Sequence, residues 1–221
     1  MVRLWFLCSR RAELTHAQYA EHLLARHAPL ALRHHATLRG YAVNVVDACA
    51  DGAPLLDSLN VLEYDALEDF TERNYDSPEG ERIVTEDHAR FLGGALGYQA
   101  EALAAHGRPG PGASWICALR RRPRLSAERF ASALVADLLP EVLAGQPSAS
   151  RIALDRVARA LFPDDAPAWD AFYQVTFADA ARAPAHPFDS PDCAVTLRRR
   201  VAALCEATAL WRVSERVMLA R

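Results

Sequence analysis

His27 is the residue whose type and spacing best suit acid–base chemistry. It lies in a segment with helical periodicity, and the positions three and four residues away on each side are apolar: Leu23, Leu24, Leu30 and Ala31. Residues at this spacing share one face of a helix, so His27 is predicted on the buried side. An imidazole titrates near neutral pH, which suits proton transfer, and a buried one needs hydrogen-bond partners. A core histidine bonded to a backbone carbonyl is the competing interpretation.

Polar residues on two predicted strands are candidate substrate-binding groups. Tyr41 and Asn44 lie on one strand, and Glu63 and Tyr64 lie on the next. Asn44 offers a donor and an acceptor to a ligand carbonyl or hydroxyl, and the alternative is a strand-edge asparagine that bonds a turn. Glu63 is a candidate carboxylate for orienting His27, and the alternative is a solvated glutamate.

Three further histidines lie close to His27 in the sequence. His34 shares its helical face two turns later, so we expect it at the mouth of the same cavity as a substrate-binding residue. His22 and His35 fall on other faces and are expected in solvent. No HExxH or HxH spacing occurs, so no metal site is expected.

The elements that must position these residues occur in the same order in both halves. In the first half, apolar or β-prone runs predict strands over 2–9, 39–46, 56–64 and 95–103. Helical periodicity covers 67–92, with an interruption at Ser77–Pro78, and 15–35, with Thr15 as N-cap. The second half is predicted to have strands over 115–121, 151–161, 168–177 and 207–219 and helices over 126–144 and 191–207.

A weak internal repeat accompanies this order. Leu14–Tyr19 aligns with Leu125–Phe130 at an offset of 111 residues, the difference between 125 and 14. The same offset places Pro29 on Pro140 and His27 on Leu138. The second half therefore has leucine where the first half has an imidazole.

Each half has the order β-α-β-β-α-β, which is the ferredoxin-like order. Helices on one face of a four-stranded sheet leave the other face bare, so two tandem repeats are expected to pack sheet to sheet. The predicted fold is α+β, an intrachain α+β barrel with an apolar interior that can hold a ligand. The repeats are 1–105 and 114–221, with a Gly/Pro-rich linker at 106–113. We expect a monomer with an internal pseudo-dimer, and its outer strands offer a route to a further homodimer.

The composition excludes several classes of protein. Of the 221 residues, 51% are hydrophobic and 24% are charged, the balance of a globular protein, and the formal net charge of −3 argues against a nucleic-acid binder. No apolar run reaches the length of about 18 residues that a membrane span needs. No secretory signal is expected, and the five cysteines are widely spaced without a CxxC pair. Free thiols in a reducing cytoplasm are the expectation.

Three segments resemble a known family. Residues 19–30 (YAEHLLARHAPL) resemble the first helix of EthD-type proteins, which belong to the dimeric α+β barrel superfamily. Residues 39–44 (RGYAVN) resemble that family's second strand, and 76–81 (DSPEGE), with Asp87 and Phe91 after them, resemble its second helix. The resemblance covers Val2 to Gln99, and the second half is similar to a degenerate second copy.

The resemblance implies chemistry without organic cofactors. Relatives include lactone-isomerising enzymes and polyketide-tailoring dehydratases, and related barrels host cofactor-free oxygenases. We therefore expect a cofactor-independent lyase or isomerase (dehydration or proton-transfer chemistry) with His27 as catalytic residue. The expected substrate is a small hydrophobic oxygenated molecule such as a polyketide, an aromatic intermediate or a lactone. The alternatives are a non-catalytic ligand-binding protein of such a pathway and a cofactor-free monooxygenase, because fold alone does not select a reaction.

Overall fold

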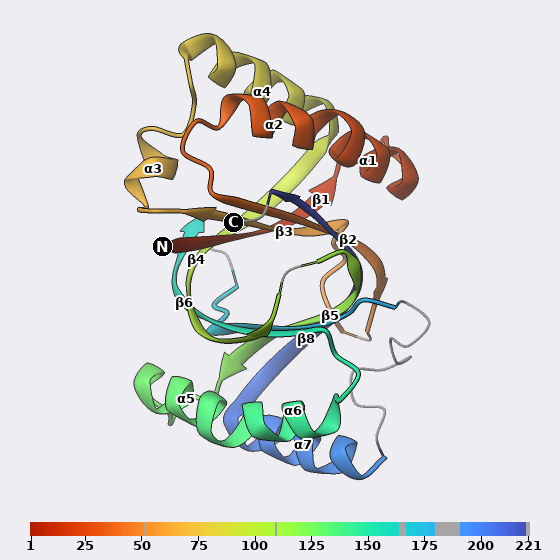
Figure 1. Cartoon of the computed structure of the whole chain (residues 1–221), viewed down its shortest axis with the longest axis vertical. Helices are drawn as coiled ribbons and strands as arrows, with labels where there is room; N and C mark the ends of the chain where they lie inside the picture. The colour runs from red at the N-terminus through yellow and green to blue at the C-terminus, as the bar shows by residue number, and fades with distance from the viewer. Residues whose placement is uncertain (51, 109, 164–166, 180–190, 220–221) are drawn as a thin grey trace.

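Eight antiparallel strands close into one barrel. The computed structural model describes residues 1–50, 52–108, 110–163, 167–179 and 191–219, with the backbone alone over 191–194. The strand order around the barrel is β1-β3-β2-β8-β5-β7-β6-β4. Helices of the first half cover one side of the barrel, and helices of the second half cover the opposite side (Figure 1). No helix in the described part of the chain is long and apolar enough to cross a membrane.

The first half contributes four neighbouring strands in the order β4-β1-β3-β2. Its strands are β1 (Val2–Arg10), β2 (Gly40–Cys49), β3 (Ser58–Tyr64) and β4 (Leu92–Gly107). The first helical segment consists of α1 (His16–His22), the π-helical turn η1 (Leu23–His27) and α2 (Ala28–His34). The second segment consists of α3 (Glu68–Thr71) and α4 (Pro78–Phe91).

The second half has its strands in the corresponding order β8-β5-β7-β6. These strands are β5 (Gly112–Arg121), β6 (Arg151–Phe162), β7 (Ala171–Phe177) and β8 (Cys205–Leu219). Its helical elements are α5 (Ala127–Ala133), η2 (Leu134–Leu138), α6 (Leu139–Gly145) and α7 (Pro191–Leu204).

The helices begin and distort where the sequence requires it. Thr15 is the N-cap of α1, as predicted, and forms a capping box with Gln18, which stabilises a helix by about 1 kcal/mol. The π-helical bond runs from the Ala28 N–H to the Leu23 carbonyl, directly before Pro29. Proline lacks an N–H and its ring clashes with the carbonyl four residues earlier, so the helix widens at this point.

Strands β4 and β5 are longer than predicted and extend into the expected linker 106–113. The first part of β4 pairs with β1, from Leu92 to Ala100, and its later part pairs with β6, from Gly97 to Gly107. Strand β4 therefore joins the two halves of the barrel, which requires the additional length. Because each of the eight described strands has a neighbour on both sides, the outer-strand route to a further homodimer has no free edge to use.

The barrel interior is not the apolar ligand cavity that we expected. Trp5, Phe172 and Trp211 fill it, and the Trp5 and Phe172 rings stack with their centroids 4.7 Å apart. Beside them lies a buried ion pair in which Arg151 Nη1 is 3.1 Å from Glu215 Oε1. Large aromatic side chains from both sheets occupy the volume in which the sequence pattern predicted a ligand cavity.

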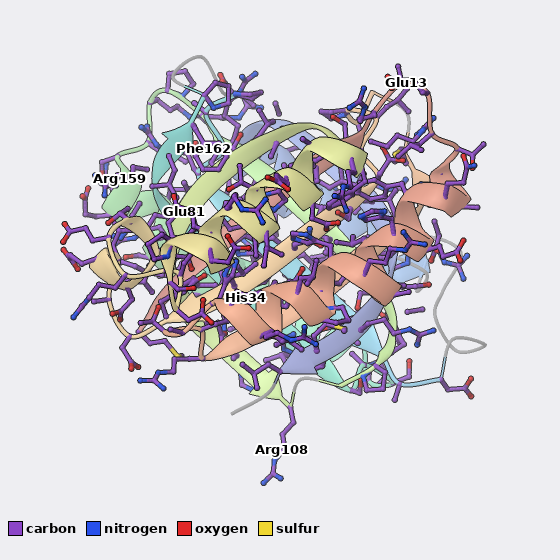
Figure 2. All side chains as sticks on the ribbon, turned by 90° about the horizontal axis from the view of Figure 1, so that it is seen from above. Glu13, His34, Glu81, Arg108, Arg159 and Phe162 are labelled. Atoms are coloured by element: carbon purple, nitrogen blue, oxygen red, sulfur yellow. The ribbon has the colours of Figure 1, made fainter. Side chains whose placement is uncertain are left out.

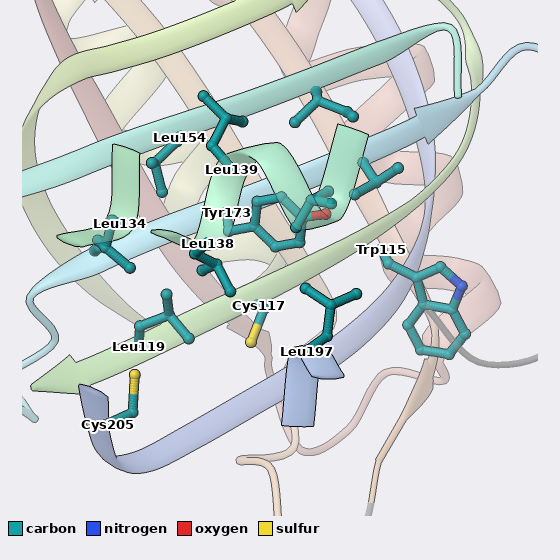
Figure 3. Packing of buried hydrophobic residues seen from close by; sticks show 14 of the residues in the cluster. Trp115, Cys117, Leu119, Leu134, Leu138, Leu139, Leu154, Tyr173, Leu197 and Cys205 are labelled. Atoms are coloured by element: carbon teal, nitrogen blue, oxygen red, sulfur yellow. The ribbon is translucent and has the colours of Figure 1, made fainter. Parts of the chain in front are cut away.

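The second half encloses a dense apolar core between its sheet and its helices (Figure 3). Leu134 and Leu138 of η2 pack there with Leu139 and with Tyr173 of β7, and all four side chains are buried. Leu138 holds the position that aligns with His27, so this half fills with hydrocarbon the space that the first half keeps open.

Candidate functional site

A large cavity lies in the first half, between the outer face of the sheet and the helices. Helices α2 and α4 lie side by side over it (Figure 2). Its volume is about 580 Å³, in the range of small-molecule sites. Its walls are mostly apolar and aromatic, with polar groups at a few points. The lining residues are Phe6, Cys8, Tyr19, Leu23, His27, Ala31, His35, Tyr41, Asn60, Leu62, Phe70, Thr71, Asn74, Tyr75, His88, Phe91, Leu92, Ala95 and Phe162.

His27 reaches this cavity from the last position of η1. His27 is 6% exposed, and its Nδ1 lies 3.0 Å from Asp87 Oδ2 on α4. A carboxylate can only accept here, so Nδ1 carries the proton and Nε2 has its lone pair free. No hydrogen bond to Nε2 comes from any residue in the described part of the chain. His27 is thus held in the orientation and tautomer of a base.

Asp87 is the residue that connects two histidines. Its other carboxylate oxygen, Oδ1, lies 2.9 Å from His22 Nε2, and the carboxylate is itself buried. The ring of Phe91, one turn further along α4, stacks on His22 at 4.8 Å and contacts the His27 ring at 4.9 Å. The contacts fix Asp87 and His27 relative to each other.

Burial keeps the imidazoles of the cavity neutral. Desolvation, followed by the charge of nearby His88, lowers the pKa of His27 to about 4. The His88 ring lies 4.4 Å from the His27 ring, and desolvation lowers the pKa of His88 as well. At pH 7 His27 is therefore an unprotonated base in an apolar wall.

Polar residues also gather near the C-terminal end of α2. His35 Nδ1 lies 3.2 Å from the Tyr64 hydroxyl, which donates a hydrogen bond of 2.9 Å to Asn74 Oδ1. Desolvation, with smaller contributions from His88 and His34, lowers the pKa of His35 to about 4. His35 is therefore a second neutral imidazole in the wall of the cavity.

One side chain of the second half forms part of the cavity wall. Phe162, at the end of β6, is labelled in Figure 2 and lies 5.8 Å from the Phe6 ring, centroid to centroid. It rests against Gly97, where a Cβ would come within 2.8 Å of its ring. The absence of a side chain at Gly97 allows this close contact, so the site of one half depends on the other half.

Strand alternation divides the predicted site residues between two faces. Tyr41 lines the cavity with His27, and Tyr64 lies on the same face of the sheet beside His35. Asn44 and Glu63 face the barrel interior instead. Asn44 Nδ2 donates to the Leu59 carbonyl at 2.8 Å.

Two further expectations were wrong. Glu63 does not orient His27, because its carboxylate pairs with Arg3 at 2.7 Å. His34 does not line the cavity, and its Nδ1 lies 3.2 Å from Asp76 at the outer side of the helix.

Several site residues were missed by the sequence interpretation. His22 and His35, which we expected in solvent, contact Asp87 and Tyr64 respectively. Asp87 was named only through the family resemblance, but the sequence also indicates its burial, because it lies with Val84 and Phe91 on the buried side of α4. A carboxylate on an apolar helical stripe requires a partner.

Among the described residues, no three His, Cys, Asp or Glu side chains converge so that they could hold a metal ion. His27 and His22 meet a carboxylate rather than each other's free nitrogen atoms.

The fold is shared with solved proteins. No family model matches the sequence, and a sequence comparison with curated proteins finds no match. An anthrone oxidase-like protein superposes with a TM-score of 0.64 at 14% identity, covering 99% of this chain and 94% of its own. A candidate monooxygenase from Lactobacillus acidophilus NCFM has a TM-score of 0.60 at 10% identity, with coverages of 100% and 97%. One from Fusobacterium nucleatum has a TM-score of 0.58 at 7% identity, with coverages of 98% and 92%. The chain therefore has the α+β barrel fold of these proteins.

Proposed function

We propose that the chain is a cofactor-independent monooxygenase in which His27 removes a proton from a neutral, hydrophobic, oxygenated substrate. The observation that carries this proposal is the hydrogen bond of 3.0 Å between His27 Nδ1 and Asp87, which leaves Nε2 as a free base in the cavity wall. The neutral state of the imidazole supports the same role, because an unprotonated base accepts a proton without first losing one.

Asp87 makes the proton transfer easier. When His27 Nε2 accepts a proton, the ring becomes a cation, and the carboxylate at Nδ1 stabilises that cation in surroundings of low polarity. Tyr41, which also lines the cavity, is suited to stabilise the negative charge that the substrate acquires. Burial raises the pKa of the Tyr41 phenol, so the hydroxyl keeps its proton and can donate it in a hydrogen bond.

The oxygen step balances without a further reductant. A substrate with an activated CH2 group loses one proton to His27 and becomes a carbanion, which transfers one electron to dioxygen. The two radicals combine to a peroxide anion, His27 returns the proton, and the resulting hydroperoxide loses water. The net reaction converts CH2 and O2 into C=O and H2O.

The structural neighbours support the choice of oxygen chemistry. Their names refer to an anthrone oxidase and to monooxygenases, and each aligns with this chain over more than nine-tenths of its own length. At identities of 14% and below they establish the fold alone, so the reaction is our proposal. Anthrone, which has an activated CH2 group between two aromatic rings, is a suitable first probe.

Oxygen consumption with anthrone tests this function. We expect the parental protein to consume dioxygen with formation of anthraquinone, and His27→Ala to lower the rate by about 100-fold or more. Leu138→Ala is the matched control, because it truncates the aligned position in the second half and leaves the cavity intact. Undiminished oxygen uptake in His27→Ala would refute the role of His27.

A lyase or isomerase is the second candidate, because the same base would begin a dehydration or a double-bond shift. That reading predicts turnover of a lactone or polyketide-like substrate without oxygen, which anaerobic incubation detects. A ligand that binds and is recovered unchanged would indicate the binding-protein alternative.

We also propose that the halves, residues 1–105 and 114–221, are tandem EthD-like, ferredoxin-like copies within a cytoplasmic monomer. Three correspondences between the halves support the tandem copies. The π turns η1 and η2 are 111 residues apart, and Thr15 and Ser126 cap the aligned helices. Arg10 pairs with Asp57 as Arg121 pairs with Asp170. A solution mass near 24.3 kDa by light scattering is expected, and a dimeric mass would contradict the monomer.

A further inference from the structure

Two buried polar atoms in the cavity wall have no hydrogen-bond partner among the described residues. His35 Nε2 and Asn60 Oδ1 make no hydrogen bond to any described residue, although the two residues are only 9% and 7% exposed. Both residues line the same cavity as His27. A buried polar atom without a partner costs free energy, so a ligand that supplies the missing partner is favoured.

The hydrogen bonds of His35 show that its free nitrogen is an acceptor. The Tyr64 hydroxyl has one proton, which it donates to Asn74 Oδ1 at 2.9 Å. The contact of 3.2 Å between that hydroxyl and His35 Nδ1 is therefore a bond in which Nδ1–H donates. Since the ring is neutral at pH 7, Nε2 carries a lone pair and no hydrogen.

Asn60 offers a second acceptor from the floor of the cavity. It lies on β3, on the face of the sheet that is directed at the helices, and its Nδ2 donates to Cys8 Sγ at 3.7 Å. The amide oxygen Oδ1 is the part of the side chain that remains without a partner. Both unpartnered atoms thus require a donor from the ligand.

We infer that His35 and Asn60 are specificity-determining residues that recognise hydroxyl groups of an uncharged aromatic substrate. The inference rests on the proposed function, since it concerns the substrate of the same cavity. A hydroxyl group donates to either acceptor, whereas a methoxy group at the same position has no hydrogen to donate. The site therefore selects a hydroxylated compound over its O-methylated counterpart.

The remaining lining residues agree with an uncharged ligand. No Arg, Asp or Glu is among the described residues that line the cavity. Burial lowers the pKa values of His27 and His88 and raises those of Tyr41, Tyr75 and Cys8, so all five are neutral at pH 7. A carboxylate or phosphate would lose its hydration without gaining a counter-ion.

Paired probes test this inference by binding rather than by turnover. The probes are 2,7-dihydroxynaphthalene and 2,7-dimethoxynaphthalene, which have the same rings and differ in the donors. Calorimetric titration of the parental protein is expected to give at least about 10-fold tighter binding of the dihydroxy compound. His35→Phe and, independently, Asn60→Leu are each expected to lower this ratio by about 5- to 10-fold.

Phe70→Leu is the matched control, because it alters the apolar wall without removing an acceptor, and it should weaken both probes alike. Equal binding of the two probes to the parental protein, no binding of either at millimolar concentration, or an unchanged ratio in both folded variants would overturn the inference. If the parental protein shows the hydroxyl preference but consumes no dioxygen with anthrone, the proposed function is refuted and this inference stands. His27→Ala should keep the preference, since it leaves both acceptors in place.

Discussion

The depressed pKa of His35 predicts a pH-dependent stability that can be measured. An unfolded chain has histidine with a pKa near 6.5, whereas burial lowers the pKa of His35 to about 4 in the folded protein. At pH values between about 4 and 6.5, His35 is protonated in the unfolded chain and neutral in the folded protein. The contribution of the neutral His35 ring to the free energy of unfolding is therefore fully present above pH 6.5 and is lost as the pH falls toward 4.

The magnitude follows from the two pKa values. At pH 7 protonation of His35 costs almost nothing, because the ring is mostly neutral in both states. At pH 5 the unfolded ring is protonated and the folded ring is not, which lowers the free energy of unfolding by about 2 kcal/mol. His27, with a similar pKa, contributes a loss of about the same size.

Urea unfolding at pH 7 and pH 5 is the assay. The parental protein is expected to lose stability between the two, and His35→Phe should lose about 2 kcal/mol less because the titrating ring is gone. His106→Gln, at an exposed position near the end of β4, controls for the removal of a histidine as such and should match the parental loss. If His35→Phe loses as much as the parental protein, the folded ring titrates like the unfolded one and the argument for a neutral cavity fails.

Two further predictions concern buried carboxylates. Asp87→Asn is expected to lower turnover by about 10- to 100-fold while the protein remains folded, because the amide no longer balances the charge on protonated His27. Steady-state rates of oxygen uptake test this, and unchanged rates would contradict it. Arg151→Met should cost about 3–5 kcal/mol in urea unfolding, since it leaves Glu215 buried without its counter-ion. The double variant with Glu215→Gln should recover most of this loss, and a double variant as unstable as the single one would show that charge is not the cause.

The order and type of the elements could be read from the sequence because they depend on local patterns. The Thr15 cap, the alternation along β2 and β3, and the helical stripe around His27 all occur where the residue types place them. Hydrophobic periodicity and capping chemistry are properties of neighbouring residues, so no tertiary information was needed.

The location of the cavity could not be read in the same way. Alternation separates Tyr41 from Asn44, but it does not reveal which face of the sheet has space beside it. That depends on how Trp5 of the first half and Phe172 of the second fill the barrel, and these residues are far apart in the sequence. The pairing of His27 with Asp87 likewise spans 60 positions and depends on how α4 packs against η1.

The same distinction explains the errors about His22 and His35. A helical wheel for the single segment 15–35 places them away from the buried stripe. The π turn at Leu23–His27 adds a residue to one turn and changes the faces on either side of it, and α4 covers a side of the helix that the wheel treats as solvent. The proline that causes the turn is visible in the sequence, but a wheel drawn for a regular α-helix does not contain the change of register that the π turn produces.

The presence of both halves in one chain has a consequence for how the protein can change during evolution. In a barrel assembled from two identical subunits, any substitution appears twice, so a leucine at the position of His27 would abolish both sites at once. Here Leu138 occupies the aligned position in the second half, and His27 occupies it in the first half. Selection for stability can therefore act on the second half, while the first half tolerates buried polar groups such as His27 and Asp87. The packed core and the buried polar groups thus lie in different halves of the chain. A mutation that stabilises the second half does not have to remove a polar group from the first half.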